Sequence, residues 1–145
     1  MRRIYSLSVL TFATILAVSC QRKNEPIPAE PNPVGGKGGN AELRVTAKHH
    51  EAIMDSCTIY IRYDANAMPT DMKWDDTMNV KVENGRYMAV FTNLKKGSYF
   101  LYGKGWDFSL EGEDKTVTGS ASFRIPDTAA RIYDTYLNVS EIHIK

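Results

Sequence analysis

The chain has 145 residues, of which 43% are hydrophobic and 24% are charged, and its formal net charge is +1. This length suits one domain of ordinary size, and the hydrophobic content is sufficient for a folded core. The near-neutral charge argues against a nucleic-acid-binding protein with a broad basic surface. Two cysteines are too few for a disulfide scaffold or a cysteine-rich zinc site.

The first 19 residues have the pattern of a bacterial targeting segment. Arg2 and Arg3 form a short basic region, and the uncharged stretch 4–19 contains an apolar run at 9–18. This run is shorter than the roughly 20 apolar residues that a membrane-spanning helix needs. The segment leads into Ala-Val-Ser-Cys at positions 17–20, which resembles the lipobox of bacterial lipoproteins.

This resemblance implies that the mature protein begins at Cys20 and that the thiol of Cys20 is acylated. The protein would then be anchored to a membrane by lipid without spanning it. Gln21 stands where lipoproteins of the inner membrane typically carry aspartate. The resemblance therefore implies the outer membrane of a Gram-negative cell, on either its periplasmic or its surface face. The alternative is an ordinary secretory signal with an incidental cysteine.

A tether is predicted to follow the lipobox. Residues 20–40 contain four prolines and then Gly-Gly-Lys-Gly-Gly at 35–39. Prolines favour an extended chain and glycines a flexible one. A phosphate-binding loop is not expected, because the required Gly-Lys-Ser/Thr sequence is missing. We therefore predict three segments: a signal peptide (1–19), a lipidated cysteine with its tether (20–40) and one folded domain (41–145).

The domain shows short runs in which apolar and polar side chains alternate, as is typical of β-strands. The predicted strands are, in chain order, 43–48, 57–63, 80–82, 87–91, 99–102, 117–125 and 137–144. Asn84-Gly85 is a strong hairpin signal, because both turn positions need a positive φ. The apolar positions of the last strand change phase near Ser140, which predicts a bulge there. Seven strands without an amphipathic helix predict an all-β fold, a single β-sandwich.

One run carries a recognisable strand–turn–strand motif, Phe91-x-x-Leu94-x-x-Gly97-x-Tyr99-x-Leu101. It resembles the carboxypeptidase regulatory-like and prealbumin-like (transthyretin-like) domains of Gram-negative lipoproteins. The resemblance implies a seven-stranded Greek-key β-sandwich in which Phe91 and Leu94 close one end of the core. It also implies a non-catalytic interaction or structural module of the cell envelope, with no cofactor. Hydrolases of the prealbumin fold end in Tyr-Arg-Gly-Ser, which this chain lacks, so we predict no catalytic residues.

Trp74 and Trp106 are the candidate ligand-binding residues. Both lie in or next to predicted loops, and an exposed indole can stack against a sugar ring. That interpretation would make the protein a carbohydrate-binding accessory lipoprotein. The interpretation that we favour is that both rings are at least half buried and cover the open ends of the core. The partner is then an unidentified envelope protein or a glycan.

Histidines and acidic residues give weaker signals. His49 and His50 are adjacent, and neighbouring strand residues face opposite sides, so they could share a metal ion only in a turn. We interpret them as polar residues at a strand end and predict no metal site; the third histidine, His143, is placed in the last strand. The acidic loop 64–77 lacks the spacing of an EF-hand, and a solvated loop is preferred to a loose calcium site. Strand parity places Cys57 inside, as a small hydrophobic residue.

Overall fold

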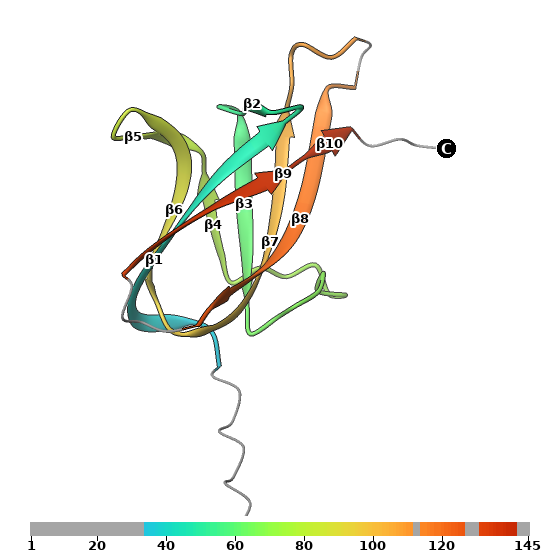
Figure 1. Cartoon of the computed structure of the whole chain (residues 1–145). Coiled ribbons are helices and arrows are strands. Elements are labelled where there is room, and N and C mark those ends of the chain that lie inside the picture. The colour runs from blue at the N-terminus through green and yellow to red at the C-terminus, as the bar shows by residue number, and fades with distance from the viewer. Residues whose placement is uncertain (1–33, 112–113, 127–130, 142–145) are drawn as a thin grey trace, which may run out of the picture.

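The computed structural model of the protein describes residues 34–111, 114–126 and 131–141 (Figure 1). The predicted signal peptide, Cys20 and His143 lie outside these residues. The described part of the chain contains ten strands, and its secondary structure is all-β as predicted. No helix in this part is long and apolar enough to cross a membrane.

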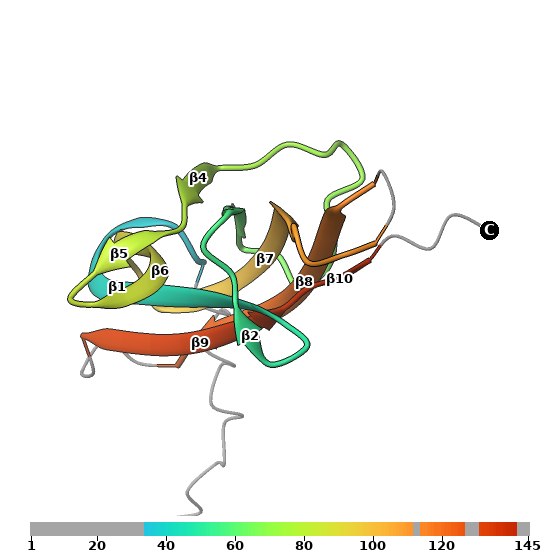
Figure 2. The ribbon, with the colours of Figure 1, turned by 90° about the horizontal axis from the view of Figure 1, so that it is seen from above.

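The strands form two sheets that pack face to face, as Figure 2 shows from above. The first sheet contains β1 (Lys37–His49), β2 (Ala52–Ile53), β5 (Lys81–Glu83), β6 (Arg86–Leu94) and β9 (Ile132–Asn138). The second has the order β10-β8-β7-β3-β4, with β3 (Cys57–Tyr63), β4 (Asp76–Asn79), β7 (Gly97–Trp106), β8 (Thr116–Ile125) and β10 (Ser140–Glu141). All pairings are antiparallel except β1 with β9. The described residues thus form a sandwich-like fold with ten strands rather than seven, and the additional strands are short.

The core follows the predicted alternation. In β1 and β3, every second side chain is fully buried between the sheets, namely those of Leu43, Val45, Ala47, Ile59 and Ile61. The apolar side chains of the strand–turn–strand motif, Phe91, Leu94, Tyr99 and Leu101, are also buried. The inward parity predicted for these strands is therefore confirmed.

The hairpin at Asn84-Gly85 is confirmed as well. Asn84 has a φ of 51° and Gly85 a φ of 77°, and the flanking strands β5 and β6 pair in antiparallel register. The strand predicted at 80–82 is found one residue later, as β5 (81–83), because the chain changes sheets at Val80. Val80 is buried between β4 of the second sheet and β5 of the first, whereas Val82 is 59% exposed.

A second change of sheet explains the phase shift predicted near Ser140. β9 pairs with β1 in the first sheet, and β10 pairs with β8 in the second. Val139 lies between them, is buried, and donates its N–H to the carbonyl of Lys48 at 2.8 Å. The irregularity is therefore a crossing between sheets rather than a bulge within one strand.

Tyr99 fixes the point at which the chain enters the sandwich. Its hydroxyl lies 3.1 Å from the backbone nitrogen of Gly36 and donates to the carbonyl of Lys95 at 2.5 Å. β1 begins one residue later, at Lys37, within the segment predicted as tether. The end of the domain at which β1 begins is therefore anchored by a buried aromatic side chain.

Cys57 is buried as predicted, with 6% of its surface exposed, and burial raises the pKa of its thiol to about 11. Because only the thiolate reacts, we expect a water-soluble alkylating reagent at pH 7.5 to leave Cys57 unmodified in the native protein and to modify it in urea. Peptide mapping by mass spectrometry would measure this at Cys57 itself. Rapid labelling of the native protein would contradict the placement of Cys57 in the core.

Candidate functional site

Trp74 lies on the outer face of the second sheet. Its ring is stacked on that of Tyr102, with centroids 5.5 Å apart and planes at 11°, and it also lies near Phe100 and Tyr60. Tyr60 and Tyr102 lie on the parity opposite to that of the core residues of β3 and β7. Trp74 is partly buried as expected, but it covers the face of a sheet rather than an open end of the core.

Trp106 is 51% exposed, so the expectation that it is at least half buried is wrong. It is the last residue of β7 and lies on the parity opposite to that of the buried residues of this strand. It lines a surface cavity of about 490 Å³ whose polar lining includes Thr58, Asn79 and Lys104. Trp74 does not line this cavity itself, but its ring contacts that of Tyr60, which does.

Three carboxylates of the acidic loop form ion pairs with basic side chains. Asp71 and Asp75 both lie within 4.0 Å of the guanidinium of Arg62, and Asp76 forms an ion pair with Lys37 at 2.8 Å. These carboxylates are balanced by basic side chains instead of facing one another. A solvated loop, as preferred from the sequence, agrees with this arrangement.

The adjacent histidines lie at a turn, which is the one arrangement in which they could share an ion. β1 ends at His49 and β2 begins at Ala52, so His50 and Glu51 form a two-residue loop. Both loop residues have a positive φ, 45° and 66°, as hairpins of this length require. This backbone brings the ring of His50 back beside that of His49, with their centroids 4.1 Å apart.

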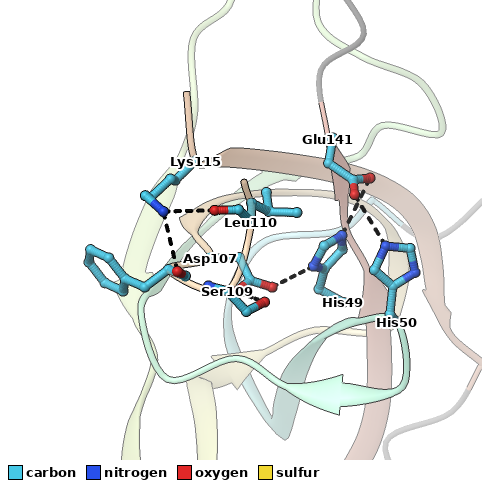
Figure 3. Close-up of polar contacts among 8 residues, drawn as sticks. His49, His50, Asp107, Ser109, Leu110, Lys115 and Glu141 are labelled. Carbon is cyan, nitrogen blue, oxygen red and sulfur yellow. Dashed lines mark hydrogen bonds and ion pairs between the residues drawn. The ribbon is translucent and has the colours of Figure 1, made fainter. Parts of the chain in front are cut away.

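Asp107 orients the first of these rings. Its Oδ2 lies 2.6 Å from Nδ1 of His49, and its Oδ1 accepts hydrogen bonds from the backbone and the hydroxyl of Ser109 (Figure 3). Asp107 directly follows β7, so this bond joins the two sheets. The hydrogen bonds from Ser109 and His49 lower the pKa of Asp107 to about 2.

Glu141 of β10 contacts both rings from the other side. Its Oε2 lies 3.4 Å from Nε2 of His49, and its Oε1 lies 3.2 Å from Nε2 of His50 (Figure 3). Its own backbone N–H and His50 lower the pKa of this carboxyl to about 2. Burial by itself would lower the pKa of His49, but the two carboxylates outweigh burial and raise it above 6.5.

In the cluster formed by His49, His50, Asp107 and Glu141, one buried nitrogen has no hydrogen-bond partner. His49 is only 2% exposed, and its Nδ1 is occupied by Asp107. Its Nε2 is the one buried side-chain nitrogen or oxygen among the described residues that has no hydrogen-bond partner, since its contact with Glu141 lacks hydrogen-bond geometry. The cluster therefore presents an unpaired imidazole nitrogen next to a second imidazole and a carboxylate.

The sequence singled out the two histidines but neither carboxylate. Asp107 lies 58 positions after His49, and Glu141 lies 91 positions after His50. Asp107 with Ser109 two residues later fits a local Asx turn, yet that pattern does not indicate a distant histidine. Only the crossing from β9 to β10 brings Glu141 to this end of the sandwich.

Comparisons of the chain with models of protein families, with curated proteins and with solved structures find no match. The function proposed below therefore depends on the residues of this chain alone.

Proposed function

We propose that the protein is an outer-membrane lipoprotein whose β-sandwich, of the prealbumin-like Greek-key type, acts as a non-catalytic interaction or structural module of the cell envelope. The observation that carries the proposal is the Ala-Val-Ser-Cys sequence at 17–20, which follows an apolar run too short to span a membrane. The motif from Phe91 to Leu101 supports the fold type. Acylation of Cys20 would hold the domain at the membrane surface.

The orientation of the sandwich supports this role. β1 begins at the end where Tyr99 contacts Gly36, and it ends at His49, at the opposite end of the domain (Figure 1). A tether attached before β1 leaves the turn after His49 and the loop after β7 on the far side from the anchor. An anchored module would present these loops to a protein or glycan partner on either face of the outer membrane.

Replacing the acylated cysteine tests the anchor directly. We expect Cys20→Ser to abolish incorporation of a fatty-acid probe and to release the protein from the membrane fraction, because no other thiol precedes the domain. Cys57→Ser is the matched control and should keep both the label and the membrane association. A Cys20→Ser protein that stays in the membrane, with an unlabelled wild type, would contradict the proposal.

A second candidate function, glycan binding, is favoured by the exposed ring of Trp106 beside its cavity. The apolar face of a sugar ring loses water against an indole, and Thr58, Asn79 and Lys104 offer hydrogen-bonding groups to its hydroxyls. Loss of one stacking ring costs about 0.5–1.5 kcal/mol of binding free energy, which corresponds to roughly 2- to 12-fold in affinity.

A polysaccharide pull-down tests this second function. We expect Trp106→Ala to weaken binding by this factor, measured by depletion of the protein from solution. Phe108→Ala is the control, because Phe108 is 75% exposed and does not line the cavity. Absence of saturable binding by the wild type, or equal losses in both variants, would exclude a glycan site at Trp106.

A further inference from the structure

We propose that His49, His50 and Glu141 bind a divalent transition-metal ion, with Asp107 positioning His49. Among the residues that the structure describes, they are the one group of three metal-ligating side chains whose ligand atoms all lie within 4.8 Å of one another. This inference goes beyond the proposed function and does not depend on the lipid anchor.

The unpaired Nε2 of His49 is the observation that points to a ligand. This buried nitrogen has lost its contact with water, and its approach to Glu141 at 3.4 Å does not replace it with a hydrogen bond, which is costly. When the neutral ring donates Nδ1–H to Asp107, Nε2 is the nitrogen that carries the lone pair, and it lies beside Glu141. A bound cation would accept this lone pair and would also balance the carboxylate of Glu141.

The spacing of the ligand atoms fits a tetrahedral ion. Ligands about 2.0 Å from zinc in a tetrahedron are about 3.3 Å apart. Oε2 of Glu141 lies 3.4 Å from Nε2 of His49, and Oε1 lies 3.2 Å from Nε2 of His50, both close to that value. One ligand atom from each of the three residues lies within 4.8 Å of the other two. Binding would bring the three ligand atoms closer together, which the mostly exposed side chain of His50 allows.

The chemistry of the three ligands indicates which metal ions would bind. Two imidazoles and one carboxylate suit zinc, copper or nickel, whereas calcium and magnesium prefer oxygen ligands alone. Three protein ligands leave one position for water or for a group of a partner. The side chain of His50 is 74% exposed and that of Glu141 is 30% exposed, so an ion can enter from solvent.

The contacts around His49 are of the kind that hold a metal-binding histidine in place. A ligating histidine commonly donates its other ring N–H to a carboxylate, which fixes its tautomer and orientation. Asp107 makes this contact at 2.6 Å and is itself held by Ser109. The loop around Ser109 is in turn tied down by Lys115, which donates to the carbonyls of Phe108 and Leu110 (Figure 3).

Equilibrium dialysis of the full-length, untagged protein against Zn²⁺, after removal of metals by a chelator, tests the site. We expect one zinc ion per chain in the wild type. His50→Ala and Glu141→Gln should each weaken zinc binding by more than about 100-fold. Loss of a group that only hydrogen-bonds a ligand already costs about 10- to 100-fold, and these changes remove a ligand itself. His50 is mostly exposed, so His50→Ala should keep the wild-type circular dichroism spectrum and melting curve. The buried His49 is left in place, since its replacement would test folding as well as binding.

Glu51→Gln is the matched control. The side chain of Glu51 is 89% exposed, lies in the same turn and pairs with Lys48 outside the cluster, so zinc binding should be unchanged. Cobalt(II) provides a second readout, because a tetrahedral site gives strong visible absorption that hexaaquo cobalt lacks. Failure of the wild type to bind zinc, binding that does not saturate, or equal affinity in wild type, His50→Ala and Glu141→Gln would each overturn the proposal. A loss of binding in Glu51→Gln as large as that in His50→Ala would overturn it too.

The positioning role of Asp107 has its own readout. Asp107→Asn should weaken zinc binding by about 10- to 100-fold. Nitrogen NMR of the imidazoles in the zinc-loaded wild type should show His49 protonated at Nδ1 and metal-bound at Nε2. In Asp107→Asn this single tautomer should give way to a mixture. An unchanged tautomer with unchanged affinity would show that Asp107 has no positioning role.

Discussion

Phe91→Ala is expected to lower the free energy of unfolding by about 3–5 kcal/mol, the usual cost of truncating a buried phenylalanine. Phe91 is fully buried in β6 opposite Leu43 of β1, and it packs within the single hydrophobic cluster between the sheets. The truncation removes apolar contacts and leaves a cavity that the surrounding strands cannot fill without breaking their hydrogen-bond register. Urea unfolding followed by tryptophan fluorescence measures the loss.

Tyr87→Ala is the control for this substitution. Tyr87 lies on the same strand but is 41% exposed, so its truncation should cost less than about 1 kcal/mol. Similar losses in the two variants, or a loss below 1 kcal/mol for Phe91→Ala, would show that β6 does not turn Phe91 into the core.

Gly119→Ala is expected to destabilise the protein by about 1–3 kcal/mol, the usual cost of overpacking. In most strand positions the same change would stabilise by about 0.5–1 kcal/mol, because glycine loses more conformational freedom on folding. Here a methyl group would clash with the carbonyl oxygen of Asn138 and would lie 2.9 Å from Cα of Val139. Both are backbone atoms at the crossing from β9 to β10, so no flexible side chain can move aside.

Ser120→Ala serves as the comparison, because Ser120 is the exposed neighbour on β8 and its change should stay within about 0.5 kcal/mol. Thermal or urea unfolding of the two variants gives the difference. A Gly119→Ala protein as stable as the wild type would show that the crossing does not approach β8 so closely.

The sequence predicted the strands that bury one face, because alternation reports burial residue by residue. β1, β3, β6, β7 and β8 all keep their predicted inward side chains, and the hairpin at Asn84-Gly85 forms through its positive φ angles. Alternation does not report which sheet a strand joins. Val80 and Val139 are both buried at changes of sheet, so they look like ordinary strand positions in the sequence.

The site was less predictable than the fold, because its parts are brought together by those same changes of sheet. His49 and His50 could be recognised as a pair, but the turn that joins their rings has neither asparagine nor glycine to signal it. Asp107 and Glu141 come from two distant strand ends. The exposure of Trp106 was not predictable, because alternation along β7 indicates which residues face outward but not how much of each outward side chain is covered.

The parallel pairing of β1 with β9 has a consequence for how the polypeptide acquires its structure. β1 is the first strand and lies between β6 and β9, and its contacts with β9 run from Glu42 opposite Ile132 to Lys48 opposite Asn138. The first sheet therefore remains incomplete during synthesis until nearly the whole domain has emerged. Contacts so distant along the chain make folding slow compared with that of helical proteins. While the chain is being synthesised, one edge of β1 thus stays exposed until β9 pairs with it.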